Sequence, residues 1–281
     1  MRRYEAGATI HVWGEHPPAL ALRPLTLCGH GARINGALNP EAQHGLLIRA
    51  SYTTVTGFTF SGARGAGIAS TDAHHVTVRG NRSIGNGGHG ISMIRGDYLV
   101  VDDNDVFENI GSRDRGLAQI SGISIFNPRA FDGGENIPRR IKVTNNRVRG
   151  NGTTAGSDGF GLILDKFTRE NPTPYRHQVL VQGNRFWDNW NSGLHIFYTD
   201  NVLVQGNRFE GNGTDETKKY AAELGIHNSH DITVRNNFAR ALRYVVWSAG
   251  REPNRVTYSG NDFGPAGRVM SPFSSAGHVG P

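Results

Sequence analysis

Cysteine is almost absent from this chain of 281 residues, since Cys28 is the only one. A single cysteine excludes an internal disulfide and any metal site built from several cysteines. Long apolar runs are missing as well: no stretch is long enough to span a membrane, and residues 1–7 lack the apolar segment of a signal peptide. We therefore expect no membrane among the partners of this protein.

Runs of lysine and arginine are also lacking, and no RNA-binding fingerprint appears. The formal net charge is nevertheless +6, with a pI near 9.7. Such a charge attracts a polyanion, either an acidic polysaccharide or a nucleic acid. Because the arginines are scattered through the chain, we expect an acidic polysaccharide or oligosaccharide and no nucleic acid.

Glycine is abundant, with 38 residues, and 12 prolines accompany it. This composition favours short strands joined by tight turns. Eight four-residue segments fall into one register, and their last residues are Phe58, Asn81, Asn104, Asn146, Asn184, Asn207, Asn237 and Asn261. The intervals between these residues are 23, 23, 42, 38, 23, 30 and 24. A period near 23 residues with three longer intervals is typical of a solenoid.

Each turn of this solenoid is expected to hold three strands. Apolar residues alternate before and after each recurring asparagine, as in half-buried strands. Asparagine suits the corner between these strands because it tolerates the left-handed conformation, and stacked amides can hydrogen-bond to one another. A second asparagine recurs at Asn86, Asn109, Asn151, Asn189 and Asn212. A third strand begins with glycine and an aliphatic residue, at Gly67-Ile68, Gly90-Ile91, Gly122-Ile123, Gly161-Leu162, Gly193-Leu194 and Gly225-Ile226.

The repeat predicts an all-β fold: a single-stranded right-handed parallel β-helix of eight or more coils, each with three short strands. We expect one domain over residues 1–281, and a monomer. Residues 1–40 are expected to form irregular coils or a cap, because the ends of a solenoid need covers. Residues 268–281, rich in Ser, Gly and Pro, are expected to form a loose tail.

These repeats resemble the bacterial parallel β-helix repeat proteins of the pectate-lyase-like superfamily, over roughly residues 6–264. That group contains many pectate lyases, other polysaccharide lyases, epimerases and glycoside hydrolases. The resemblance implies a protein that acts on polysaccharides and a secreted or periplasmic location. It is specific for the fold and loose for the reaction, because the repeated residues are structural.

Insertions in a solenoid mark the face that carries function, since they leave the stacked coils undisturbed. The insertions here are residues 110–120 with 127–139, 152–157 with 168–177, and 213–223, all flanking the third strand. Aligning Ile226 with Leu194 places His195 and His227 at the same outward position of adjacent coils, about 5 Å apart and facing solvent. Asp165 is expected beside Phe197 one coil away.

These outward residues suggest a groove for an acidic sugar chain. We predict His195 and His227 as base and acid partner for proton removal next to a uronate carboxylate, with Tyr198 as the alternative acid and Asp165 as an orienting group. Lys166, Arg129 and Arg139 are the predicted carboxylate binders. Phe126 and Phe197 offer apolar faces to sugar rings. The predicted activity is β-elimination by a polysaccharide lyase.

A closer resemblance connects two adjacent coils to family-nine pectate lyases. Ser157-Asp158-Gly159-Phe160, followed one coil later by Trp190-Asn191-Ser192-Gly193-Leu194-His195, is similar to their Asp-Gly-Phe coil and Ser-Asp-Asp-Gly coil. In those enzymes aspartates hold calcium and a lysine is the base. Here Ser192-Gly193 lacks the Asp pair and His227 stands nearest the place of that lysine, so we expect no cofactor and no metal.

Three alternatives stay open. A glycoside hydrolase needs two carboxylates about 5 to 10 Å apart, which Asp165 with Asp158 or with Glu223 can supply. A non-catalytic glycan-binding or structural β-helix needs the groove without proton transfer, and the two histidines are then an exposed ladder with no role. Zinc held by His195, His227 and Asp165 is also chemically reasonable.

Overall fold

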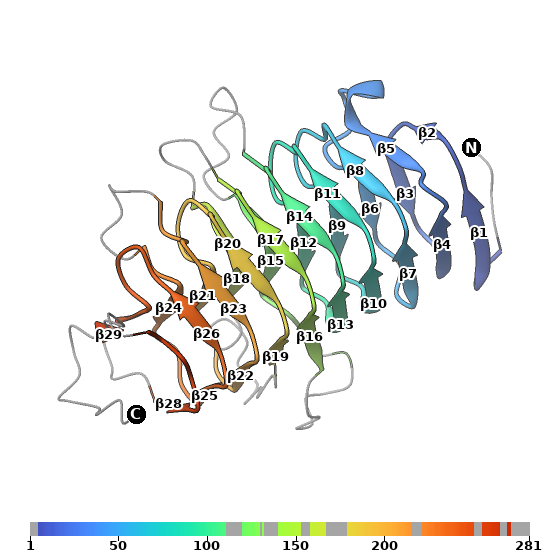
Figure 1. The fold of residues 1–281 in the computed structure, drawn as a ribbon. Helices are drawn as coiled ribbons and strands as arrows, with labels where there is room; N and C mark the ends of the chain where they lie inside the picture. The colour runs from blue at the N-terminus through green and yellow to red at the C-terminus, as the bar shows by residue number, and fades with distance from the viewer. Residues whose placement is uncertain are drawn as a thin grey trace.

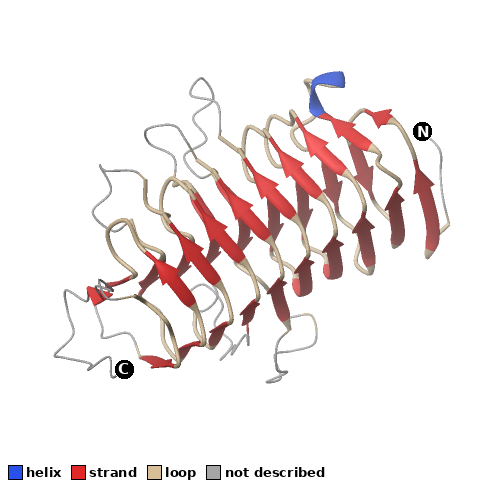
Figure 2. Cartoon of the chain, in the orientation of Figure 1, coloured by secondary structure: helices blue, strands red, loops and turns tan. Residues whose placement is uncertain are grey.

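The computed structural model describes residues 5–110, 120–129, 131, 140–152, 158–166, 179–214, 221–249, 255–264 and 269–270. These residues form three parallel sheets that wind around one axis, so that each coil adds one strand to each sheet (Figure 1). Figure 2 shows strands along the whole rod and one short helix, the 3-10 helix η1 (Gly36–Leu38), near its amino-terminal end. Among these residues, no helix has the length and apolar character needed to cross a membrane.

The bounds of the strands follow the order of the coils. Within the described residues, the first sheet contains β1 (Ala8–Val12), β4 (Leu25–Gly29), β7 (Thr53–Thr56), β10 (His74–Arg79), β13 (Asp97–Asp102), β16 (Ile141–Thr144), β19 (Val179–Gln182), β22 (Val202–Gln205), β25 (Ile232–Arg235) and β28 (Val256–Ser259). The second contains β2 (Glu15–His16), β5 (Arg33–Asn35), β8 (Thr59–Ser61), β11 (Arg82–Ile84), β14 (Asp105–Phe107), β17 (Arg147–Arg149), β20 (Arg185–Trp187), β23 (Arg208–Glu210) and β26 (Phe238–Arg240). The third contains β3 (Ala19–Ala21), β6 (Leu46–Ile48), β9 (Ile68–Thr71), β12 (Ile91–Ile94), β15 (Ser121–Phe126), β18 (Phe160–Asp165), β21 (Leu194–Phe197), β24 (Leu224–His227), β27 (Val246–Ala249) and β29 (Val269–Met270).

The parallel β-helix predicted from the repeat is therefore confirmed. Residues before Pro40, expected to form irregular coils or a cap, contribute β1 to β5 to the three sheets. The predicted loose tail, residues 268–281, lies almost entirely outside the described residues.

The core runs along the axis between the three sheets. Its rows are the stacked inward residues of successive strands, each almost completely buried: Val55, Val78, Val101, Val143, Val181, Val204 and Val234 in the first sheet, and Ile68, Ile91, Ile123, Leu162, Leu194, Leu224 and Val246 in the third. Parallel pairing at a fixed register places like side chains above one another, which is why an apolar residue recurs at the same place in each repeat. Fully burying one such side chain contributes about 1.5–3 kcal/mol to the free energy of folding, so the rows together make a large favourable contribution.

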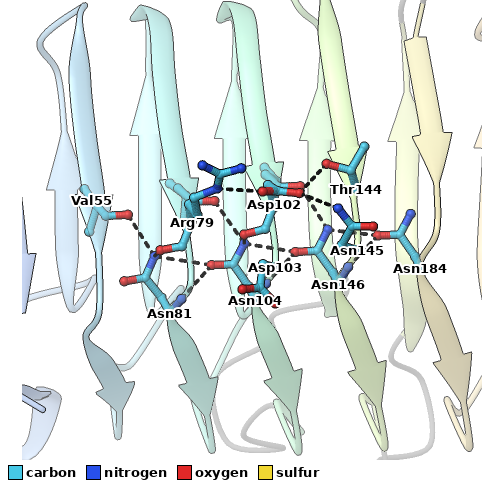
Figure 3. Close-up of polar contacts among 12 residues, drawn as sticks. Val55, Arg79, Asn81, Asp102, Asp103, Asn104, Thr144, Asn145, Asn146 and Asn184 are labelled. Carbon is cyan, nitrogen blue, oxygen red and sulfur yellow. Dashed lines mark hydrogen bonds and ion pairs between the residues drawn. The ribbon is translucent and has the colours of Figure 1, made fainter.

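Two buried ladders of asparagine side chains run beside this core. In the first, the Nδ2 group of each asparagine donates to Oδ1 of the next, with N to O distances of 3.2 Å from Asn81 to Asn104 and 2.9 Å from Asn104 to Asn146. Figure 3 shows Asn81, Asn104, Asn146 and Asn184 in line across adjacent coils. The second ladder joins Asn86, Asn109, Asn151, Asn189 and Asn212. Both predicted ladders are confirmed.

One of the two reasons for asparagine at the corner is wrong. The residue with positive φ precedes the ladder asparagine, as at Gly80 (60°), Asp103 (51°) and Asn145 (55°). The other reason is confirmed, because the amides of the ladder asparagines hydrogen-bond to one another and so satisfy buried donors and acceptors.

Candidate functional site

A pocket of about 230 Å³ lies on the outer face of the third sheet, over β18, β21 and β24. Its lining is polar and aromatic, and consists of Asp158, Phe160, Ile163, Asp165, His195, Phe197 and His227. The structure thus brings together four of the predicted site residues: His195, His227, Asp165 and Phe197.

The register of β24 differs from the sequence prediction. Leu194 pairs with Leu224, His195 with Gly225 and Phe197 with His227. The predicted equivalence of His195 and His227 is therefore wrong by two residues, because Gly225-Ile226 does not begin the strand. Since side chains alternate faces with a period of two, both histidines still project to the outer face.

His195 and His227 are nevertheless neighbours across this diagonal. Their ring centroids lie 4.9 Å apart at an interplanar angle of 81°. The contact depends on Gly225, the direct partner of His195 in the sheet. A Cβ atom at Gly225 would stand 2.6 Å from Nδ1 of His195, so only glycine leaves the imidazole room to lean toward His227.

His195 is buried, with 4% of its surface exposed, and the prediction that it faces solvent is wrong. Phe160 covers it, at 4.4 Å between ring centroids. Burial, and to a lesser degree the neighbouring His227, hold the pKa of His195 well below its ordinary value. The imidazole is consequently neutral at neutral pH and able to accept a proton.

His227 is half-buried, and burial lowers its pKa as well. It occupies the same row as Asp165 and Phe197, since Asp165 pairs with Phe197 and Phe197 with His227. The predicted neighbourhood of Asp165 and Phe197 is confirmed. Asp165 is 4% exposed, so the neighbouring residues shield most of its surface from solvent.

Lys166 and Tyr198 occupy equivalent turn positions just after β18 and β21. Both have a positive φ, 59° and 47°, so the extended backbone of each strand ends at these residues. Nζ of Lys166 lies 5.3 Å from the centroid of the Phe126 ring, a cation–π distance. The Tyr198 ring packs against Phe197 at 4.4 Å. Lys166 and Tyr198 directly follow Asp165 and Phe197, which line the pocket.

Arg129, a predicted carboxylate binder, is not among the residues that line the pocket. It is exposed and follows β15, and its charge helps to lower the pKa of Asp72, which follows β9. Its electrostatic effect is therefore directed toward the earlier coils. Arg139 lies outside the described residues, as do most residues of the three predicted insertions.

A family model described as "Right handed beta helix region" matches residues 31–168 and 174–267. The chain belongs to this family. Solved structures similar to this right-handed β-helix protein include an alginate lyase from Paenibacillus sp. str. FPU-7, with a TM-score of 0.61, 17% identity, and 94% of this chain and 91% of that chain covered.

Two further solved structures share the β-helix. The Dettilon tailspike protein has a TM-score of 0.57 and 15% identity, covering 94% of this chain and 61% of that chain. The A-module of the mannuronan C-5 epimerase AlgE4 from Azotobacter vinelandii has a TM-score of 0.51 and 13% identity, covering 94% and 91%. At such identities these likenesses show the fold alone. A comparison with curated proteins finds no match.

Glu223, an alternative carboxylate for hydrolysis, has a different position in this β-helix. It closes the second asparagine ladder, where its two carboxyl oxygens accept hydrogen bonds from the backbone N–H of Asn212 at 3.2 and 3.3 Å. The side-chain amide of Asn212 also donates to it. Glu223 is fully buried, and burial raises its pKa to about 8. It does not line the pocket, so Asp158 and Asp165 are the carboxyl groups found there.

The larger hollow of the β-helix lies elsewhere. About 580 Å³ opens at the amino-terminal end, where Leu25 and Leu27 are only partly buried. Among the described residues its lining contains no carboxylate, lysine or tyrosine, so it offers less chemistry than the smaller pocket. The described residues also contain no cluster of three or more His, Cys, Asp or Glu suited to a metal ion.

Sequence reasoning missed the residues that shape the surroundings of His195. The sequence pointed to Phe160 only through the resemblance to family-nine pectate lyases. It placed Gly225 at the start of the third strand instead of opposite His195. Both follow from the register: once Leu224 is paired with Leu194, glycine falls opposite His195 and the space beside the imidazole becomes visible.

Proposed function

We propose that this protein is a carbohydrate-active enzyme that cleaves an acidic, uronate-containing polysaccharide by β-elimination. Fold alone does not assign a reaction. The observation that carries the proposal is the buried His195, unprotonated at neutral pH and in ring contact with a second imidazole inside a pocket. The alginate lyase and the mannuronan epimerase, which are named for uronate polymers, have the same fold over more than nine-tenths of the chain and make this substrate class reasonable.

The proposed reaction needs one proton acceptor and one proton donor. His195 removes the proton from C5 of the uronate, the electrons of that C–H bond form the C4–C5 double bond, and the C4–O bond breaks. The departing oxygen takes a proton from Tyr198 or His227. Because burial lowers the pKa of His227, its protonated form is scarce at neutral pH, which favours Tyr198 as the donor.

Positive charge supports proton removal by stabilising the carboxylate of the sugar in its enolate-like form. Lys166 directly follows Asp165 of the pocket lining, and the net charge of +6 favours the approach of a polyanion. Asp165 is proposed to orient an imidazole, as a carboxylate does in many acid–base sites. Phe197, in the row of Asp165 and His227, offers its ring to the sugar.

A panel of uronate polymers tests the proposal. Incubation with polymannuronate, polyguluronate, polygalacturonate and polyglucuronate is expected to give products with the ultraviolet absorbance of a conjugated double bond from at least one polymer. His195→Ala should abolish that signal, while His230→Ala should keep it, because His230 faces Asp200 at 3.4 Å outside the pocket. Full activity of His195→Ala would refute the assignment of the base.

Hydrolysis is the second candidate, since Asp158 and Asp165 both line the pocket. Retaining and inverting glycosidases both require two such carboxyl groups. New reducing ends without ultraviolet absorbance, lost in both Asp158→Asn and Asp165→Asn, would favour hydrolysis. Binding of a polymer with no new ends would instead indicate a glycan-binding β-helix.

A further inference from the structure

Ser192 lies two residues before β21, the strand that carries His195. Ser192 has none of its surface exposed, and its Oγ has no hydrogen-bond partner within the described part of the chain. The same holds for Nδ1 of His195. Buried polar groups are nearly always paired, so two orphaned atoms beside a candidate active site call for an explanation.

The two orphaned atoms face the same small space. A Cβ atom at Gly225 would stand 2.6 Å from Nδ1 of His195 and 3.3 Å from Oγ of Ser192. Gly225 thus leaves open the volume between the hydroxyl and the imidazole. Its φ is not in the positive range, so glycine is required here for space and not for backbone conformation.

We propose that Ser192 is a positioning residue for His195: its hydroxyl accepts a hydrogen bond from Nδ1–H, directly or through one water molecule in the space left by Gly225. With the hydroxyl as the acceptor, Nδ1 carries the hydrogen of the neutral imidazole, which has one N–H and one acceptor nitrogen. Nε2 is then the basic nitrogen.

This inference deepens the proposed function and rests on it for its role in the reaction. A base must present its unprotonated nitrogen to the substrate, and the hydrogen bond at the other nitrogen decides which one that is. His227 lies on the diagonal, with its ring at 81° to that of His195. On the side of Gly225, Oγ of Ser192 and Nδ1 of His195 border the same space, which makes Ser192 the candidate partner.

The test reads the tautomer directly. Nitrogen NMR of protein labelled with ¹⁵N-histidine distinguishes Nδ1–H from Nε2–H imidazole, and His195→Ala assigns the signal. The wild type is expected to show the Nδ1–H form of His195, and Ser192→Ala a mixture of both forms. Ser121→Ala is the matched control. Ser121 stands two residues before Ile123, as Ser192 stands two residues before Leu194 in the same row, and its Oγ is also buried and unpartnered. An Nε2–H tautomer in the wild type overturns the proposal.

Kinetics give a second measurement on the same variants. Ser192→Ala is expected to lower kcat about 10-fold to 100-fold with little change in KM, and Ser121→Ala to change neither. Gly225→Ala should lower kcat as well, by pushing the imidazole out of its place. Equal kcat in Ser192→Ala and wild type overturns the positioning role. If no uronate polymer is cleaved by the wild type, the proposed function fails, while the tautomer still decides whether Ser192 holds His195.

Discussion

Replacing Glu223 with glutamine is expected to remove a loss of stability at high pH. In the folded protein burial raises the pKa of Glu223 from 4.5 to about 8. At pH values between 4.5 and about 8, Glu223 is therefore protonated in the folded chain and ionised in the unfolded chain. Stability must fall as the pH rises through this window, and the loss is complete above about pH 8.

The magnitude follows from the same shift. At about 1.36 kcal/mol per pKa unit, the change from 4.5 to about 8 corresponds to at most about 5 kcal/mol. We expect a loss on the order of 3 to 5 kcal/mol, since the pKa of about 8 already includes the opposing effect of the hydrogen bonds from Asn212 to the ionised form. Glutamine keeps one acceptor oxygen and cannot ionise, so its cost, roughly 1–3 kcal/mol, does not vary with pH.

Urea unfolding followed by circular dichroism at pH 5 and pH 9 measures this difference. Wild type should lose several kcal/mol relative to Glu223→Gln between the two pH values. Glu210→Gln is the control: Glu210 is paired with Arg208, which lowers its pKa, so its ionisation does not change between pH 5 and 9. The same pH dependence in Glu223→Gln and wild type would refute the buried-acid argument.

Three further predictions follow from other parts of the structure. Asn104→Ala should destabilise the protein by on the order of 3 kcal/mol in urea unfolding, because Asn81 and Asn146 lose their partner in the buried ladder. The control variant Gln205→Ala, which removes an exposed hydrogen-bonded pair, should lower the free energy of unfolding by less than about 0.5 kcal/mol. Asp97→Asn should lower the free energy of unfolding by about 3–5 kcal/mol, since it removes the carboxylate that pairs with the buried Arg140. Asp72→Asn, at the exposed pair with Arg95, should lower it by less than about 1 kcal/mol. Similar losses in both variants would contradict this reasoning. The kcat/KM of elimination should stay level as the pH falls to 6.5 and decline only in more acid solution, because the base titrates well below its ordinary pKa; a midpoint at or above 6.5 would exclude His195 as that base.

The coils could be predicted from the sequence because their chemistry repeats. Asn104 hydrogen-bonds to amides on both adjacent coils, so an asparagine recurs at the same place of each coil whether 23 or 42 residues separate the two. Inward residues such as Val101 follow from the same register. This is why the fold, both ladders and five of the six third strands were predicted correctly.

The site could be predicted only in part. Glu223 stands where earlier coils have glycine, and a Gly-Ile pair two residues later imitated the start of the strand. A slip of two residues preserves the face of each side chain, so both histidines were correctly placed on the outer face while their row was wrong. The burial of His195 depends on Phe160 and on the space at Gly225, which no single repeat reveals.

The most direct test of the proposed site is a structure of the His195→Ala variant with a bound uronate oligosaccharide. We expect one sugar in the pocket, with the hydrogen on its C5 directed at the place of the missing imidazole and its carboxylate turned toward Lys166. An oligosaccharide seated on another face of the β-helix, or one whose C5 hydrogen points away from position 195, would contradict the proposed chemistry.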